Sequence, residues 1–388
     1  WAAVTAMLGG DEAQSARLST VTLRELLPEG DSETALDRPL KRLLADFQGR
    51  RDRFNQYSFP FGLLRLREAI AAYTEGLYGW RPDPENEVTV TLGATEALAS
   101  ALAAICKRGD RVIVPQPYHE MYPSQAAVLG LEPVYVTLVE DAEAGIWKLD
   151  RDEWAAAARG ARVLILNTPH NPTGKVFSND DLVWLEELTH RHDLLVVTDE
   201  IYEHIVFDDN QHRSLGASPS MRGRTIVVNS ISKTGNATGW RVGWAISPKA
   251  YTPALRAFHD TMVIQAPTPF QQAAVTLLEL DRSSYDAIRT AYVSRRDLLV
   301  GALRHVGFGV SPPQGAYYVF ARYADVPRIG GVSPVAATQH LLKQVGVACV
   351  PGDNFYAAGG STSHYLRFAF CRSLSTLKNA AERLASLG

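Results

Sequence analysis

The sequence predicts an α/β protein with a mainly parallel mixed sheet in a large domain, followed by a smaller α+β domain. Short apolar runs alternate with helical patterns through the middle of the chain, as in strands that are joined by helical crossovers. Glycine or proline directly follows most of these runs, where a strand is expected to end. From about residue 266 the alternation gives way to a long helical pattern up to Arg304, and then to short strands near residues 315–320 and 366–370.

Seven short apolar runs predict the buried strands of the large domain. They cover residues 88–92, 111–114, 133–136, 163–166, 194–198, 225–228 and 242–245. Helical patterns lie between several of them, for example at residues 94–105 and 179–192. Because ligands of open α/β sheets bind beyond the carboxyl ends of the strands, the residues that directly follow these runs are the candidates for chemistry.

The change in pattern divides the chain into three predicted parts. Residues 51–270 are expected to form the large ligand-binding domain, and residues 271–388 the small C-terminal domain. Residues 1–50 are too few for a domain of their own, so we expect them to pack with the small domain.

Composition favours a small-molecule partner. Of the 388 residues, 46% are hydrophobic, which is ample for a large core. The formal net charge is -3 and the basic residues are scattered, so there is no electrostatic footprint for nucleic acid or for a membrane surface. The three cysteines lie far apart without CxxC spacing, which predicts reduced thiols and no metal site. No apolar run approaches the ~20 residues of a membrane span and the first residues lack a signal-peptide pattern, so we expect a cytoplasmic protein.

The segment SISK, at residues 230–233, is the most informative one. It directly follows the predicted strand at 225–228, where burial could neutralise Lys233 and make it a nucleophile toward an aldehyde. The hydroxyls of Ser230 and Ser232, with Arg241 eight positions beyond the lysine, could converge on one phosphate. On its own, Lys233 would more often be an ordinary surface lysine.

A second candidate, Asp199, ends the predicted strand at 194–198. An aspartate at this depth could pair with the protonated nitrogen of a pyridine ring and keep that ring electron-withdrawing. The alternative is a helix N-cap, a common role for an aspartate in this position.

A third candidate lies in the turn NTPHNPTG, at residues 167–174, which follows another predicted strand. Its proline and glycine content predicts a tight loop. Functionally, Asn171 could donate a hydrogen bond to a phenolic oxygen of the cofactor and Tyr202 a second one, which would lower the pKa of a Schiff base.

Gly93, Ala94 and Thr95 form the fourth candidate, at the start of a predicted helix. Free N–H groups and the helix dipole make such a start an anion site. Many strands enter helices in this way, so the segment is informative only together with Ser230 and Arg241, with which it would complete a phosphate-binding cup.

In their order and spacing, these segments resemble the class I and II aminotransferases of fold type I, the family of the aspartate and kynurenine aminotransferases. The most specific pieces are NTPHNPTG, VVTDEIY, and SISK followed by TGWRVGW. The resemblance covers nearly the whole chain, and it implies the fold type I architecture and pyridoxal 5'-phosphate as cofactor.

The resemblance implies a role for each candidate residue. Lys233 would carry the cofactor as a Schiff base and move a proton between the α-carbon of the substrate and C4′ of the cofactor. Asp199 would bind the pyridine nitrogen, with Tyr202 as a further catalytic residue. The cofactor-binding set would comprise Gly93, Ala94, Thr95, His119, Asn171, Asp199, Tyr202, Ser230, Ser232, Lys233, Arg241 and Tyr57.

Two positions carry expectations about the partner subunit and the substrate. Tyr57 opens the stretch YSFPFG, whose tyrosine in the family reaches the phosphate of the neighbouring subunit, so the resemblance implies a homodimer with shared active sites. Arg367, together with Asn171, would bind the substrate, with the arginine gripping its carboxylate. Independently of the resemblance, an arginine among apolar neighbours suggests that an anion pairs with it.

Two departures from the family pattern stand out. His119 occupies the position at which the family usually places a Phe, Tyr or Trp on the cofactor ring, and it brings a group that can titrate. The alternative is that His119 is a spacer and Tyr118 packs beneath the ring. Residues 18–28 replace the short strand that lines the substrate pocket in relatives, and Tyr122 and Tyr318 are further candidate pocket walls.

The function expected from the sequence is amino-group transfer between an amino acid and a 2-oxo acid, in a ping-pong cycle through Lys233. The alternative is a reaction of another kind on the same fold and cofactor, namely elimination, replacement or cyclisation on an amino acid. A non-catalytic binding module is disfavoured, because every residue of the predicted cup is present.

Overall fold

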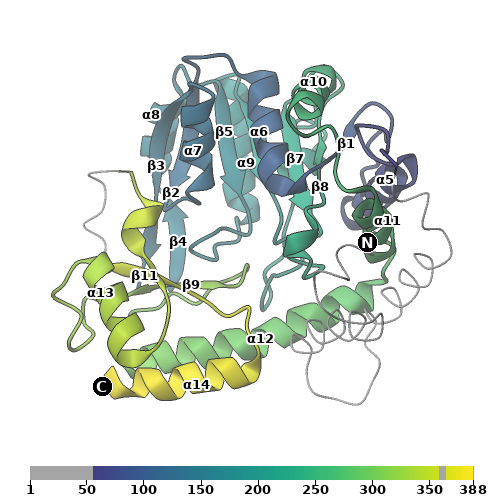
Figure 1. Cartoon of the computed structure of the whole chain (residues 1–388). Coiled ribbons are helices and arrows are strands. Elements are labelled where there is room, and N and C mark those ends of the chain that lie inside the picture. Colours follow the sequence, from purple (N-terminus) through teal and green to yellow (C-terminus); the bar gives the residue numbers. More distant parts are fainter. Residues whose placement is uncertain (1–55, 358–363, 388) are drawn as a thin grey trace, which may run out of the picture.

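An eight-stranded sheet forms the centre of the computed structural model, which describes residues 56–357 and 364–387 (Figure 1). In spatial order its strands are β1 (Val88–Thr91), β8 (Gly243–Ile246), β7 (Thr225–Ser230), β6 (Leu195–Asp199), β5 (Val163–Asn167), β2 (Arg111–Gln116), β3 (Glu132–Asp141) and β4 (Ile146–Leu149). Strands β7, β6, β5, β2 and β3 pair in parallel, whereas β8 runs antiparallel to both of its neighbours. The predicted mainly parallel mixed sheet is thereby confirmed.

Each of the seven predicted strands is present in this sheet. The edge strand β4 was not predicted. It is only four residues long, pairs with β3 alone, and has one buried residue, Trp147. A continuous apolar run marks strands that are covered on both faces, and β4 lacks that signal.

Helices cover both faces of the sheet, which explains the apolar runs. On one face lie α6 (Gly93–Ile105), α7 (Met121–Val128) and α10 (Thr252–Val263), and on the other α8 (Arg151–Ala158), α9 (Asn179–Arg191), α5 (Leu64–Tyr78) and α11 (Thr268–Leu278). Successive residues of a strand point to opposite faces. Accordingly Ile165 packs in the core under α6, and its neighbours Leu164 and Leu166 pack with α8 and α9.

A second, three-stranded antiparallel sheet forms the smaller part. It consists of β10 (Val350–Pro351), β11 (Tyr365–Ala369) and β9 (Tyr318–Arg322). The long helix α12 (Arg282–His305) runs beneath both sheets, with α14 (Leu374–Leu384) alongside it, and α13 (Pro334–His340) packs near β10 (Figure 1). The predicted strand near residues 315–320 begins later, because Gly315 instead donates a backbone hydrogen bond to the loop at Gly174, 2.8 Å away.

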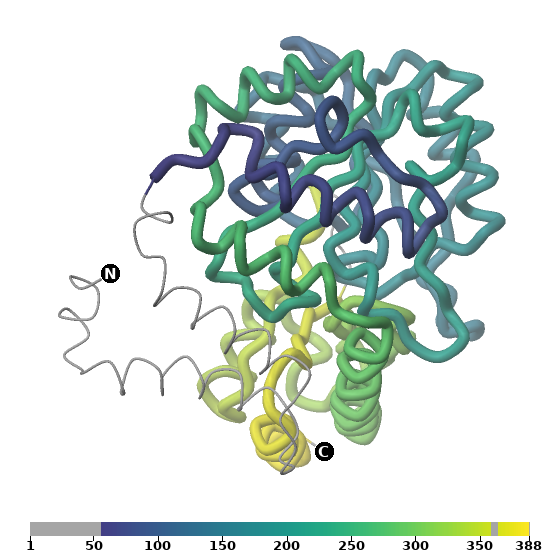
Figure 2. The backbone as a smooth tube through the Cα atoms, turned by 90° about the vertical axis from the view of Figure 1, so that its right-hand side faces the viewer, coloured from purple at the N-terminus to yellow at the C-terminus, as the bar shows by residue number. Residues whose placement is uncertain are grey.

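The predicted domain boundary after residue 270 stays a prediction. Helix α11 begins just before it and packs against α5, and Figure 2 shows this green segment beside the purple start of the described chain. The expected packing of residues 1–50 with the small domain lies outside the described residues, as does the unusual segment 18–28.

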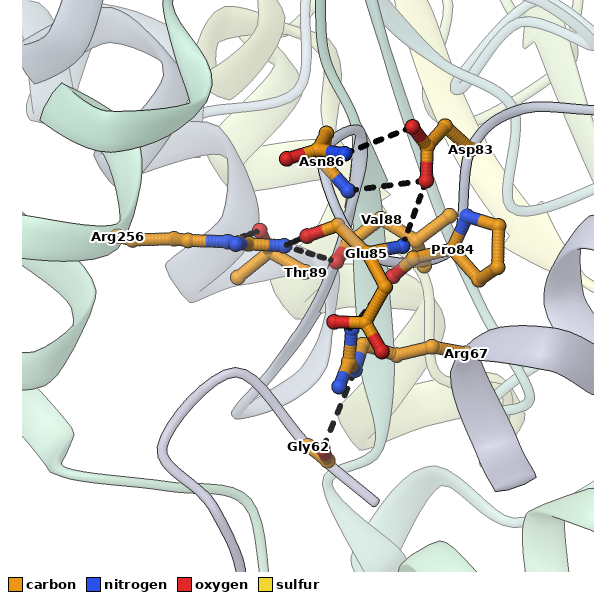
Figure 3. Close-up of polar contacts among 9 residues, drawn as sticks. All are labelled: Gly62, Arg67, Asp83, Pro84, Glu85, Asn86, Val88, Thr89 and Arg256. Atoms are coloured by element: carbon orange, nitrogen blue, oxygen red, sulfur yellow. Dashed lines mark hydrogen bonds and ion pairs between the residues drawn. The ribbon is translucent and has the colours of Figure 1, made fainter. Parts of the chain in front are cut away.

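Two arginines hold the loop that leads into the edge strand β1 (Figure 3). Arg67 pairs with the carboxylate of Glu85 at 3.1 Å and donates to the carbonyl oxygen of Pro84 at 2.6 Å. Arg256 donates to the carbonyl oxygens of Glu85 and Val88 at 2.8 and 2.9 Å. Since β1 runs directly into the start of α6, these contacts help to fix the position of that helix terminus.

Within residues 56–357 and 364–387, none of the helices has the length and apolar character that crossing a membrane requires. The cytoplasmic location expected from the sequence stays a prediction.

Candidate active site

The carboxyl ends of the parallel strands bring the predicted residues together. Asn167 and Asp199 are register partners at the ends of β5 and β6. The side-chain amide of Asn167 donates to the backbone carbonyl of Asp199 at 2.9 Å, and its carbonyl oxygen accepts from the backbone N–H of Asn171 at 2.7 Å. Strand β7 ends at Ser230, one strand further along. Asn167, which was not among the predicted site residues, therefore joins the Asn171 loop to the end of β6.

Lys233 lies in a tight turn just beyond β7. Backbone hydrogen bonds from Gly235 to Ile231 at 2.9 Å and from Ala237 to Ser232 at 3.1 Å define the turn. The Nζ atom of Lys233 lies 5.9 Å from the ring centre of Tyr202 and 5.7 Å from that of Tyr317. Burial lowers the pKa of Lys233, and the cations of Arg241 and Arg367 lower it further, against the opposing charge of Asp199. The amine is thereby shifted toward its neutral, nucleophilic form.

Asp199 is almost completely buried at the end of β6. The hydroxyl of Tyr122 donates to its Oδ2 atom at 2.8 Å. Burial raises the pKa of Asp199 to about 6, and the Tyr122 hydrogen bond offsets part of that rise. Asp199 does not cap a helix, since the residues after it form turns. Tyr122, expected only as a pocket wall, is thus a direct partner of the buried acid.

Asn171 is buried in the compact loop between β5 and α9, and one of its polar atoms has no partner. Its Oδ1 accepts from Arg367 at 2.9 Å, but its Nδ2 has no hydrogen-bond acceptor among the described residues. A buried donor without an acceptor is costly. The site therefore presents a fixed donor to whatever binds there.

Arg367 reaches this loop from β11 of the small sheet. Its guanidinium lies between two aromatic rings, 4.4 Å from the centre of Tyr318 and 4.7 Å from that of Phe355. In the described part of the chain no carboxylate forms an ion pair with it, and Asn171 is a neutral partner. A half-buried, unpaired guanidinium is suited to a carboxylate ligand, which it can grip with two parallel hydrogen bonds.

The start of α6 and Arg241, which the sequence predicted as an anion site, lie close together. Gly93 has a φ of +75°, and a Cβ added to it would lie 2.5 Å from Nη2 of Arg241, so a glycine is required here. Arg241 itself has a left-handed φ of +55°, and its Nη2 lies 3.5 Å from Oγ1 of Thr95. Ala94 and Thr95 follow in the first turn of the helix.

Ser230 and Ser232 lie at and just after the end of β7, where Ser230 is the register partner of Gly243. Both are buried, and the backbone N–H of Ser232 donates to Oγ of Ser230 at 3.3 Å. Free N–H groups, a guanidinium and hydroxyls of this kind are what a phosphate binds.

Tyr202 and Tyr57 lie in contrasting surroundings. Tyr202 is buried, its hydroxyl lies 3.4 Å from that of Tyr318, and burial raises its pKa far above the ordinary value. Tyr57 is 76% exposed and its side chain makes no hydrogen bond to another described residue, so it does not join the site within this chain.

His119 lies at the start of α7. Its Nδ1 accepts from the backbone N–H of Met121 at 3.2 Å, and its ring centre lies 5.8 Å from that of Tyr122. Burial lowers the pKa of His119, Arg367 and Lys233 lower it further, and Glu120 opposes them. Because Nδ1 accepts, the neutral imidazole carries its proton on Nε2. The predicted contact between this ring and the cofactor stays a prediction.

The chain is similar to known proteins over most of its length. Residues 27–384 match the family model described as aminotransferase class I and II. Methionine aminotransferase of Escherichia coli (strain K12) is 35% identical over 341 residues, which cover 86% of this chain and 84% of the relative. Human kynurenine–oxoglutarate transaminase 1 is 33% identical over 355 residues, with 85% and 84% covered. The solved structure of N-succinyldiaminopimelate aminotransferase from Mycobacterium tuberculosis has a TM-score of 0.85 at 33% identity, and 97% and 96% of the two chains are covered.

The buried charge of Asp199 predicts a gain of stability on its removal. Its folded-state pKa of about 6 lies above the ordinary value of 3.8, so it lowers the stability of the ligand-free protein as pH rises through this window. Asp199→Asn should make the ligand-free protein more stable above pH ~6, by at most about 3 kcal/mol, and equally stable below pH ~4. Urea unfolding of both proteins across this pH range measures the difference. A variant that is less stable than wild type at pH 8 contradicts the argument.

Proposed function

The chain belongs to the class I and II aminotransferases, as its motifs predicted, and on that premise we propose that Lys233, Asp199 and Arg367 carry out its amino-group transfer. Members of this family use pyridoxal 5'-phosphate. The observation that carries the proposal is a chain of contacts. Arg367 donates a hydrogen bond to Asn171, the backbone N–H of Asn171 donates one to Asn167, and Asn167 donates one to the backbone carbonyl of Asp199. The charge of Asp199 in turn raises the pKa of Lys233.

The described residues fit this cofactor at three points. The Nδ2 donor of Asn171 lacks an acceptor, which the phenolic oxygen would supply. Arg241 lies over the start of α6, where a side chain at position 93 would collide with it, and this cradle suits the phosphate. Asp199 is a buried acid whose ionised form lacks a cation at contact distance among the described residues, and a protonated pyridine nitrogen would provide one.

When bound, the cofactor supplies an aldehyde carbon and a ring that withdraws electrons from the α-carbon of the substrate. Lys233, with its pKa lowered by burial, would move the proton between that α-carbon and C4′. Asp199 would hold the ring nitrogen in its protonated form, because a nearby carboxylate favours the cation. Asn171 and Tyr202 would donate to the phenolic oxygen, and the high pKa of Tyr202 keeps its hydroxyl protonated for that purpose.

Arg367 binds the α-carboxylate that every amino acid and every 2-oxo acid presents. The stacked rings of Tyr318 and Phe355 hold the guanidinium plane in place. Since both substrates share this carboxylate, one site serves both halves of a ping-pong cycle. The relatives named above transfer amino groups from different donors at similar identity, so the proposal concerns the reaction and leaves the donor open.

Replacing Lys233 tests the proposal directly. The purified protein with added pyridoxal 5'-phosphate should absorb near the wavelength of a Schiff base, and an amino acid alone should convert it to the pyridoxamine form. Lys233→Ala should retain the cofactor without that band and lose at least about 1000-fold in turnover, because it removes the amine that lies beside Tyr202 and Tyr317. Wild-type protein that releases ammonia without forming pyridoxamine phosphate would instead favour elimination.

Replacing Arg367 tests how substrates bind. Arg367→Leu should lower kcat/KM by about 100-fold for the amino acid and for the 2-oxo acid alike, through loss of charge-assisted hydrogen bonds. Arg367→Lys should recover only part of the loss, since an ammonium cannot form the bidentate pair. Steady-state kinetics with both substrates measure this. An effect on only one half-reaction contradicts a shared carboxylate site.

We further propose that two copies of the chain share their active sites, with Tyr57 reaching the phosphate of the partner. The exposed ring of Tyr57 and its neighbour Phe59, which is 60% exposed, support this arrangement, since exposed apolar side chains that lie together favour a protein interface. Light scattering should give twice the chain mass. Tyr57→Ala should weaken cofactor binding while the variant remains a dimer, and a fully active monomer would refute the proposal.

A further inference from the structure

Two buried glutamates of the segment after β6 take no part in the function proposed above. Glu200 and Glu203 flank Tyr202 and are buried on the opposite side of the sheet end. Glu203 accepts hydrogen bonds from the hydroxyls of Tyr73 and Tyr78, which both belong to α5. It also accepts from the side-chain amide of Asn229 at 2.5 Å. A charged group buried this deeply requires partners, and here all three are neutral donors.

The protonation states around Glu203 are mutually consistent. Burial raises the pKa of Tyr73 and of Tyr78 far above the ordinary value, so both hydroxyls keep their protons and donate. Nε2 of His204 lies 2.5 Å from the hydroxyl oxygen of Tyr73, and burial lowers the pKa of this histidine. A neutral His204 therefore donates to Tyr73, which donates to Glu203. Both carboxylate oxygens are occupied, which argues against a cation between Glu200, Glu203 and His212.

Glu203 connects two segments of the active site. It follows Tyr202 directly in the sequence. Its partner Asn229 accepts, through Oδ1, the backbone N–H of Ser230 at 2.7 Å. The side chains of residues 229 and 230 point to opposite faces of β7. Glu203, on the α5 side, is therefore linked through Asn229 to the backbone N–H of Ser230, whose side chain points to the α6 side.

We propose that Glu203 is a positioning residue for the phosphate end of the cofactor site, acting through Asn229 on Ser230. This inference rests on the proposed function. Loss of the carboxylate frees the amide of Asn229, which then no longer holds the N–H of Ser230 in one place. Loss of this carboxylate should therefore weaken the binding of ligands that carry a phosphate more than that of ligands without one.

Glu200 provides a matched control. It is also buried, three positions away, and held by comparable bonds, from Ser214 at 2.9 Å and from His212 at 3.1 Å. It has no hydrogen bond to Asn229. Glu200→Ala thus removes a buried carboxylate in the same way as Glu203→Ala, without affecting the proposed connection.

The test is a double-mutant cycle on the full chain freed of cofactor, titrated with pyridoxal 5'-phosphate and with pyridoxal, which lacks the phosphate. Glu203→Ala and Asn229→Ala should each weaken binding of the phosphate form about 10-fold, and the double variant also about 10-fold, because each variant removes the same hydrogen bond between residues 203 and 229. In the control cycle, the effects of Glu200→Ala and Asn229→Ala should multiply. Binding of pyridoxal should change by less than about twofold.

Each other outcome has a definite meaning. A loss of about 100-fold in the Glu203→Ala, Asn229→Ala double variant, or an equal loss for pyridoxal, overturns the inference in favour of a purely structural role. Wild-type protein that binds both ligands equally overturns the proposed function instead. Should Glu203→Ala not fold, Tyr78→Phe replaces it in the cycle, because Tyr78 reaches Asn229 only through Glu203. Independent effects of these two variants would then overturn the inference.

Discussion

The burial of Asp199 at the end of β6 is the constraint on which the rest of the site depends. An ionised carboxylate in this position is unfavourable, which is why burial raises its pKa to about 6 even though Tyr122 donates to it. Asp199 is only 2% exposed, so water solvates it poorly. A ligand that brings a cation to this carboxylate removes the cost of burying its charge. The relief of that cost then adds to the free energy of ligand binding.

The proposed catalytic residues lie on one face of the parallel sheet, and the residues that hold them lie on the other. Asp199 and Ser230 point toward the face that α6 covers, and Glu200 and Asn229 point toward the face that α5 and α9 cover. Strand periodicity alone produces this division, because neighbouring residues alternate. The proposed catalytic and cofactor-binding residues are thus next in the sequence to the residues that hold them, but they lie on the opposite face of the sheet. A rigid support of this kind is what a site needs to hold groups in a productive geometry.

The sequence predicted the strands and the site residues that follow them, because these depend on local pattern. It missed the hydrogen bonds between distant segments, because these depend on the order of the strands and the packing of the helices. The seven central strands are apolar throughout because both faces are buried, and Lys233, Asp199 and Asn171 stand out because they directly follow such strands. The hydrogen bond between Tyr122 and Asp199 joins residues 77 positions apart, and that between Tyr73 and Glu203 joins residues 130 apart. No spacing rule reaches across such distances, since these contacts arise only once α5 and α7 pack on a sheet of known order.

The charged residues of the site indicate which charged groups a ligand must carry. Among the described residues, Asp199 has no cation in contact, and Arg367 and Arg241 have no anion in contact, while the charges of all three shift the pKa of Lys233. A ligand that carries one cationic nitrogen and two separate anionic groups satisfies every one of these groups at once. A cofactor with a pyridine nitrogen and a phosphate, together with a substrate carboxylate, has that pattern. Asp199 and Arg241 belong to the part of the chain that holds the large sheet, whereas Arg367 lies on β11 of the small sheet. Under the proposed function, therefore, the two parts of the molecule bind different partners, the large one the cofactor and the small one the substrate carboxylate.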